Sequence, residues 1–358
     1  MTLTDYCSLL TVHYLLLTDE TPMAAMHALA NPASQRIERG VRPFDIGRDL
    51  HPVARLIADA FADELDVQGE AALRELRIMG HMSGLVRLLS RTTGEFQDVF
   101  NGFVWIEDGK LVGNVTVQRA ASGSGRWQIA NVAVDPDYRG RGISRGLMET
   151  ALDYIREMGG TWAVLQVREQ NQIARGLYER LRFETMGGTV EMRCPRTPKV
   201  SGHPALPGLA PFSAADSTLL YDLVNSEQSA ESQWWRAVRR ADFDVPFEQG
   251  FGEWFSRLLG RDRVYRVALR DFTGRFESAL ILTARRWQGE HSLQIFVRPD
   301  TQERYERKLI LWALSTLQEY PVWPVTTTLN TTHTAARSTL EEFGFQARTT
   351  LLTMRRKI

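Results

Sequence analysis

The stretch Asn131–Ser144, which reads NVAVDPDYRGRGIS, limits the possible folds of this chain more than any other. It begins with three apolar residues, 132–134, typical of a buried strand. After a turn and two glycines, a helical pattern begins at Ile143. The first N–H groups of a helix have no partner inside it, and the helix dipole is positive at that end. A strand, a glycine turn and a helix start in this order therefore predict a phosphate-binding site.

Four residues of the turn strengthen that prediction. Gly140 and Gly142 have no side chain that would keep the main chain away from an anion. Arg139 and Arg141 add positive charge beside them. We therefore expect the turn to bind a diphosphate.

The hydrophobic periodicity on both sides of this stretch predicts an α/β protein with a mixed sheet. Asp-Gly at 108–109, between two apolar runs, indicates a hairpin. Up to residue 193, we expect strands at 40–44, 103–106, 111–117, 127–134, 162–167 and 183–193, and helices at 45–61, 70–90, 143–158 and 171–181.

Two motifs in this order resemble the GNAT superfamily of acyl-CoA-dependent N-acyltransferases. One is Arg139-x-x-Gly142-x-Ser144, where the family has Gly or Ala in the last place. The other is Asn171-x-x-Ala174-x-x-Leu177-Tyr178 followed by Phe183, with Arg182 in place of the usual glycine. The resemblance covers residues 40–194 and implies the GNAT fold, with a mostly antiparallel sheet and one central parallel pair.

The second half of the chain repeats the same order after a linker rich in proline and glycine. Val134 matches Val297 and Phe183 matches Phe345, so the offset is nearly constant. We expect two tandem GNAT-like domains. The expected organisation is an N-terminal extension at 1–35, poorly ordered or preceding a true start at Met23 or Met26, a catalytic domain at 36–195, a linker at 196–210 and a degenerate copy at 211–358.

The two copies differ at the positions that would carry the chemistry. Residues 302–305 read QERY where the first copy has RGRG. His333 stands at the place of Asn171, and Leu340 at the place of Tyr178. We therefore expect the second copy to keep the fold and to bind the cofactor poorly or not at all.

The resemblance implies that the strand pairs with the pantetheine arm and that the turn holds the pyrophosphate of acetyl-CoA. Tyr178 is our candidate acid for the leaving thiolate, since a phenol is protonated at neutral pH; it could also only pack in the core. Asn171 would cap its helix and bond the cofactor arm, or only cap the helix. The expected cofactor-binding residues are Val132, Ala133, Val134, Arg139, Gly140, Arg141, Gly142, Ile143, Ser144, Asn171 and Tyr178.

The general base is not evident from the sequence. Ribosomal-protein alanine acetyltransferases, a branch that this turn resembles, carry a Glu in a Leu-Glu-Val-Arg context, and here that position is Gln166. Glutamine cannot accept a proton, so that mechanism does not carry over. Glu64, Asp66, Glu70, His81 or a water relay remain open, although each side chain is more often a surface residue.

Composition excludes several other classes. The 43 Lys+Arg and 43 Asp+Glu cancel, so net charge indicates neither nucleic acid nor an anionic membrane as partner. Two cysteines give no disulfide framework and fit a reducing cytoplasm, and the histidines are too scattered for a metal site. The turn also lacks the third glycine of a dinucleotide loop.

The favoured hypothesis is an N-acetyltransferase, monomeric or homodimeric, that moves an acetyl group from acetyl-CoA to a primary amine of a small molecule or peptide, without a metal. The alternative is a non-catalytic sensor that binds acyl-CoA. Gln166 fits this alternative, because the ribosomal-protein alanine acetyltransferases have a glutamate at that position.

Overall fold

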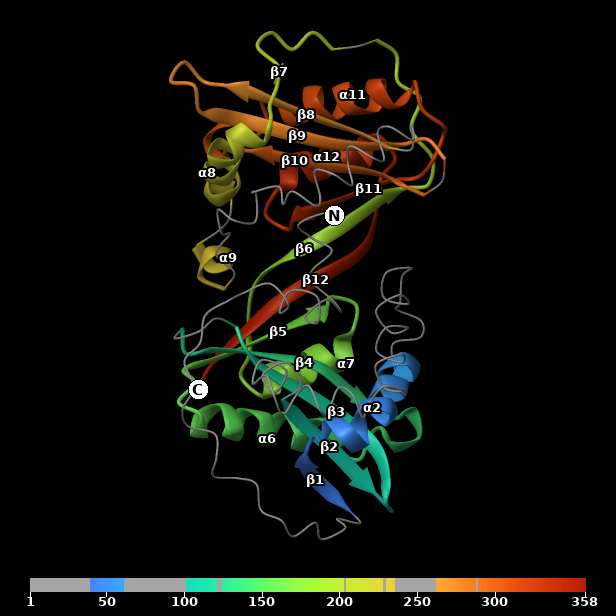
Figure 1. Cartoon of the computed structure of the whole chain (residues 1–358), viewed down its shortest axis with the longest axis vertical. Helices are drawn as coiled ribbons and strands as arrows, with labels where there is room; N and C mark the ends of the chain where they lie inside the picture. The colour runs from blue at the N-terminus through green and yellow to red at the C-terminus, as the bar shows by residue number, and fades with distance from the viewer. Residues whose placement is uncertain are drawn as a thin grey trace. The chain divides into compact units, whose positions relative to one another are not determined.

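A computed structural model of the chain describes residues 39–60, 101–120, 124–202, 204–227, 230–235, 262–287 and 289–358 (Figure 1). The predicted extension at 1–35, the predicted helix at 70–90 and the candidate bases Glu64, Asp66, Glu70 and His81 lie outside these residues.

The described elements confirm the predicted α/β order of helices and strands. The first half contains β1 Gly40–Pro43, α2 Ile46–Ala60, β2 Gly102–Glu107, β3 Lys110–Arg119, β4 Arg126–Val134, the 3₁₀ turn η1 Pro136–Tyr138, α6 Ile143–Glu157, β5 Trp162–Arg168, α7 Gln172–Arg180 and β6 Glu184–Cys194. The second contains β7 Ala210–Pro211, η2 Ala214–Asp216, α8 Ser217–Glu227, α9 Ala230–Trp235, β8 Asp262–Arg270, β9 Phe276–Arg285, β10 His291–Val297, η4 Pro299–Thr301, α11 Glu306–Leu317, β11 Val325–Asn330, α12 Thr334–Glu342 and β12 Gln346–Lys357.

These elements form two compact units that exchange short segments of chain. The first unit comprises Met1–Leu165, Leu177–Glu184 and Arg355–Ile358, and the second comprises Gln166–Gly176 and Thr185–Met354. Strand β6 therefore follows the first unit in sequence but packs almost entirely in the second.

The sheet of the first unit runs β1-β2-β3-β4-β5, and only the β4–β5 pair is parallel. Asp108 and Gly109 turn the β2–β3 hairpin, with φ values of 49° and 74°. Two positive φ values match a type I′ turn, whose twist suits paired strands.

Helices α2 and α6 cover opposite faces of this sheet. Val104 and Ile106 of β2 pack in one cluster with Val53 and Ile57 of α2. Trp105, which points the other way because side chains alternate along a strand, lies against α6. A Cβ on Gly146 of α6 would lie 2.8 Å from the Trp105 ring, so that glycine permits the close contact.

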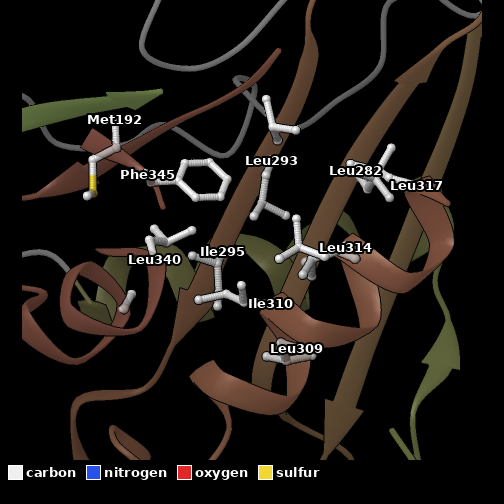
Figure 2. Packing of buried hydrophobic residues seen from close by; sticks show 14 of the residues in the cluster. Met192, Leu282, Leu293, Ile295, Leu309, Ile310, Leu314, Leu317, Leu340 and Phe345 are labelled. Atoms are coloured by element: carbon white, nitrogen blue, oxygen red, sulfur yellow. The ribbon is translucent and has the colours of Figure 1, made fainter. Parts of the chain in front are cut away.

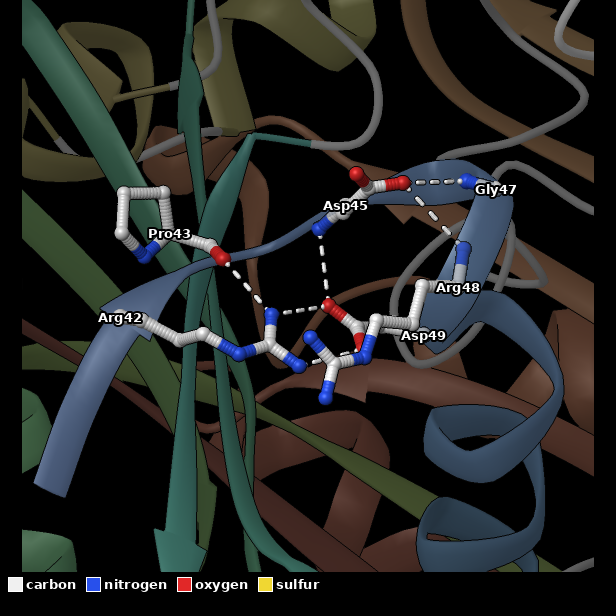
Figure 3. Close-up of polar contacts among 6 residues, drawn as sticks. All are labelled: Arg42, Pro43, Asp45, Gly47, Arg48 and Asp49. Atoms are coloured by element: carbon white, nitrogen blue, oxygen red, sulfur yellow. Dashed lines mark hydrogen bonds and ion pairs between the residues drawn. The ribbon is translucent and has the colours of Figure 1, made fainter. Parts of the chain in front are cut away.

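A buried ion pair fixes the start of α2 to β1, as Figure 3 shows. The Arg42 guanidinium donates to both oxygens of Asp49 at 2.5 and 2.7 Å. The Asp45 carboxylate accepts from the N–H of Gly47 at 2.8 Å and so caps the first turn of α2. The hydrogen bond to Asp49 raises the pKa of Arg42.

The core of the second unit lies between α11, α12 and a sheet in the order β6-β11-β10-β9-β8-β7 (Figure 2). Met192 contributes to this core from β6. Leu340, the counterpart of Tyr178, is fully buried there. Its role in the second copy is therefore packing.

Backbone geometry supports the repeat that the sequence offset predicts. Gly140 and Glu303, 163 positions apart, have φ values of 77° and 71°. Arg182 and Gly344, 162 apart, have values of 62° and 86°. Both members of each pair thus have the left-handed conformation, although only one residue of each pair is glycine.

Candidate functional site

The turn between β4 and α6 presents unpaired N–H groups at the start of α6. Gly142 is the N-cap of α6, with φ 79° and no side-chain cap. In the part of the chain that the structure describes, no group accepts from the N–H of Ile143 or Ser144. Residues 139–142 are exposed, and a Cβ on Gly140 or Gly142 would meet nothing within 4 Å. The turn is therefore open to an anion.

The charged side chains of the turn also fix its shape. Arg139 donates from Nε to the carbonyl of Val134 at 3.3 Å, and Arg141 donates to the carbonyl of Asp137 at 3.2 Å. Both guanidinium groups therefore remain beside the turn, where an anion would lie.

Lys110 is a further cation at this turn, which the sequence did not reveal. It pairs with Asp135 at 2.8 Å, and the Asp135 carboxylate also accepts from the N–H of Asp137 at 3.1 Å. The hydrogen bond from Lys110 lowers the pKa of Asp135. Lys110 and Arg141 lie 5.2 and 4.8 Å from the centre of the Tyr138 ring. Lys110 comes from the β2–β3 hairpin, so only the pairing of β3 with β4 brings it here.

Strand β4 carries a bulge just before the turn. The β3–β4 register shifts between Asn114 and Thr116, so that Asn131 and Val132 together face Val115. Asn131 has φ 51°, a left-handed conformation that asparagine tolerates. The buried Asn114 side chain donates to the Asn131 carbonyl at 3.0 Å. Bulges redirect backbone groups and are frequent beside active sites.

The side of β4 that faces β5 is only partly paired. Arg126–Ile129 pair with Trp162–Leu165, while β4 continues to Val134. Residues 130–134 of β4 thus lie beyond Ile129, its last residue that pairs with β5. They include the segment that is expected to bind the pantetheine arm. Free backbone groups there can hydrogen-bond an extended amide-bearing ligand.

Tyr178 lies on α7 with a buried ring. The ring packs against Phe183 with 6.0 Å between centroids, and 6% of the residue is exposed. Burial raises the pKa of Tyr178 to about 12, so the phenol stays protonated throughout the neutral range. Its hydroxyl has no hydrogen-bond partner among the described residues.

Asn171 and Gln166 belong to the second unit. Asn171 accepts from the N–H of Ala174 at 3.0 Å, so it caps the helix on which Tyr178 lies. The Gln166 amide donates to Thr353 at 3.5 Å. The sequence predicted either that Asn171 caps this helix and also bonds the cofactor arm, or that it only caps the helix. The structure shows the cap.

The second unit has a carboxylate at the corresponding helix start. Glu306, the first residue of α11, accepts from the N–H of Tyr305 at 3.2 Å and is 1% exposed. His333 lies 3.2 Å from Glu306 and 2.7 Å from Glu227. Strand β10 also pairs with β9 without a register shift. A buried side chain thus occupies the position that is open in the first unit.

The described residues contain no cluster of His, Cys, Asp or Glu arranged to hold a metal ion. None of the described helices has the length and apolar character to cross a bilayer.

Comparisons with known proteins find similarity to one family in this part of the chain. Residues 75–183 match the model of the acetyltransferase (GNAT) family. The chain is 31% identical over 183 residues to a mycothiol acetyltransferase of Thermobifida fusca, covering 47% of this chain and 50% of that protein. It is 43% identical over 55 residues to the [ribosomal protein bS18]-alanine N-acetyltransferase of Escherichia coli K12, covering 15% of this chain and 37% of that protein. The chain thus spans about half the length of the mycothiol acetyltransferases that it matches.

Solved structures share the fold over most of the chain. A GCN5-related N-acetyltransferase from Sphaerobacter thermophilus matches with a TM-score of 0.55 at 15% identity, covering 90% of this chain and 96% of that one. A tandem GNAT protein from the clavulanic acid biosynthesis pathway matches with a TM-score of 0.52 at 14% identity, covering 89% and 98%. These likenesses confirm the mixed α/β fold expected from the two motifs.

Proposed function

We propose that this chain is a GNAT-type acetyltransferase, because residues 75–183 match that family and a mycothiol acetyltransferase is 31% identical over 183 residues. It moves an acetyl group from acetyl-CoA to a primary amine by direct attack in a ternary complex. The observation that carries this proposal is the open start of α6 at Gly142, with its unpaired N–H groups and two arginines held beside it. A diphosphate fits such a site through hydrogen bonds and charge together.

Each part of the first unit has a role in this reaction. Residues 139–144 hold the pyrophosphate of acetyl-CoA, which supplies the activated acyl group when bound. The backbone of 132–134 pairs with the pantetheine arm. The bulge at Asn131 would leave a β4 N–H free to hydrogen-bond the thioester oxygen, and one such donor typically contributes about 10²–10³ in rate. Tyr178 donates a proton to the leaving thiolate.

The second unit of the same chain is proposed not to bind the cofactor. Glu306 already places a negative charge on the helix start that a phosphate would need, and it is held there by His333. Since like charges repel strongly when buried, displacement by a diphosphate is unfavourable. We therefore propose the organisation expected from the sequence: a catalytic domain at 36–195, a linker at 196–210 and a degenerate copy at 211–358.

The acceptor is proposed to be a small-molecule or peptide amine in the cytoplasm. By their names, the relatives act on mycothiol and on a ribosomal protein. The general base is proposed to be Glu64, Asp66, Glu70 or His81, or a water relay in its place.

The first experiment measures binding and turnover separately. Calorimetry of the whole chain with acetyl-CoA is expected to give one site per chain, and release of free thiol with a panel of small amines and N-terminal peptides is expected to show acetyl transfer. Two sites per chain would contradict the assignment of the second unit. One site without turnover for any amine would support the sensor, and no binding would overturn both.

Gly142→Ala tests the turn itself. The substitution meets no protein atom within 4 Å, but it costs about 1–2 kcal/mol because φ is 79°. Its Cβ would also stand where the diphosphate approaches, so we expect acetyl-CoA affinity to fall roughly tenfold or more.

Gly159→Ala provides the matched control for that variant. Gly159 follows the other end of α6 with φ 72°, and a Cβ there also meets nothing within 4 Å. It should lower the melting temperature by a similar amount and leave acetyl-CoA affinity unchanged. Equal affinities of the two variants would remove the turn from the binding site.

A further inference from the structure

The first unit has a second concave site, which is rich in arginine and separate from the turn. A pocket of about 340 Å³ is lined by α6, by the last residue of α7 and the two that follow it, and by the end of β12. Its arginines are Arg156, Arg180, Arg182 and Arg356. Arg156 lies more than three helical turns beyond Ile143, roughly 20 Å along the axis of α6. The proposed cofactor site and this pocket are therefore at different places on one helix.

The positive charge of the pocket is not neutralised by its own acids. Asp153 pairs with Arg156 at 2.5 Å, and Glu149 pairs with Arg145, which does not line the pocket. The guanidinium groups of Arg182 and Arg356 have no hydrogen bond or ion pair within the described ranges. Among the described residues, the two acids that line this pocket, Glu149 and Asp153, thus already have arginine partners of their own.

The arginines of this pocket repel one another. Burial lowers the pKa of Arg356, and the nearby charges of Arg156 and Arg182 lower it further, while Asp153 offsets only part of this. Arginine normally stays charged, so the chain carries this repulsion in the free state. A bound anion would remove it.

Arg182 adds a second, independent observation. Its φ is 62°, a conformation that costs a non-glycine residue about 1 kcal/mol or more. Gly344 holds the corresponding place in the second unit, with φ 86°, so glycine suits this turn. Strained residues kept at such places are characteristic of functional sites.

The backbone also holds the pocket in shape. The N–H of Ile358 bonds to the carbonyl of Thr161 at 2.9 Å, and Arg355 lies over the Trp162 ring at 5.2 Å. Arg356 is therefore fixed by its neighbours on both sides. Leu152 and Leu181 provide an apolar wall.

We propose that this pocket binds a small oxyanion with two or more negative charges, either a phosphate or a polycarboxylate. Planar guanidinium groups bind carboxylate and phosphate through paired hydrogen bonds, and converging arginines require more than one negative charge. The short apolar wall fits a carbon chain between carboxylates. The pocket is thus a ligand site in addition to the proposed cofactor site.

Calorimetry on the whole chain tests this, with citrate, inorganic phosphate and acetate as probes and with KCl keeping ionic strength constant. We expect saturable binding of citrate or phosphate and none of acetate at the same concentration. Arg182→Gln and Arg356→Gln should each weaken binding about tenfold or more. Arg356→Lys, which keeps the charge, should recover part of it.

Two control variants separate this pocket from other causes. Arg337→Gln removes an exposed arginine of the second unit and should change nothing. Arg141→Gln changes the turn between β4 and α6, so it should weaken phosphate binding only if phosphate binds at that turn. Three results would overturn the proposal. They are loss of phosphate binding in Arg141→Gln alone, equal binding in Arg356→Gln and the wild type, and no saturable heat up to about 10 mM of probe.

Discussion

Replacing Tyr178 with phenylalanine is expected to lower acetyl-transfer turnover about 10²–10³-fold while acetyl-CoA affinity changes less than about threefold. The reason is that the phenol is the proposed proton donor to the leaving thiolate, and phenylalanine keeps the ring but not the proton. The hydroxyl has no protein hydrogen-bond partner among the described residues, so its removal leaves no buried group unpaired. Steady-state kinetics and calorimetry on the same preparation measure both effects.

The pH profile distinguishes this role from packing. Because the pKa of Tyr178 is raised to about 12, its deprotonation should not limit the wild-type rate below about pH 10. Tyr154→Phe on α6 is the matched control, since that ring also packs against aromatic rings, those of Phe103 and Trp127. Unchanged turnover in Tyr178→Phe, or an equal loss in Tyr154→Phe, would exclude Tyr178 as the acid.

Most of the fold could be predicted because its signals are local. The apolar stripe of α6, the Asp108-Gly109 turn and the glycine-bearing junction at Gly142 each depend on residues close in sequence. The exchange of β6 into the second unit could not be predicted. Its alternating apolar residues, such as Val190 and Met192, would bury equally well against either sheet.

The part of the site that a single segment forms, the turn, could be predicted from the sequence. The residues that strand pairing brings to it could not. Lys110 and Asn114 reach the turn and the bulge only through the pairing of β3 with β4. Asn131 did give a signal, because asparagine is unfavourable within a strand and tolerates positive φ. In the second unit, the structure places the carboxylate of Glu306 on the helix start, one residue beyond the segment 302–305 that the sequence comparison singled out.

Glu306→Ala is expected to destabilise the second unit by about 3–5 kcal/mol, the usual cost of breaking a buried ion pair. The substitution removes the hydrogen bond that Glu306 accepts from the N–H of Tyr305 at the start of α11, and it leaves His333, which is 1% exposed, with Glu227 alone. At about 2–4 °C per kcal/mol for units of this size, the melting temperature should fall by roughly 6–20 °C. Differential scanning calorimetry measures it. Glu341→Ala, which breaks an exposed pair with Arg337 on α12, is the matched control and should cost at most about 0.5 kcal/mol.

The same cluster predicts how stability changes with pH. Desolvation alone would lower the pKa of His333, but Glu227 and Glu306 outweigh it and raise the pKa to about 9. A group whose pKa rises on folding stabilises the fold fully below its unfolded pKa, about 6.5, and loses that contribution as pH rises through 9. The shift corresponds to about 3 kcal/mol. Between pH 6 and pH 9.5 the melting temperature of the second unit should therefore fall by about 6–12 °C. His333→Asn, which cannot take up a proton, should flatten this decline, and an equally steep decline in that variant would show that the cluster does not control it.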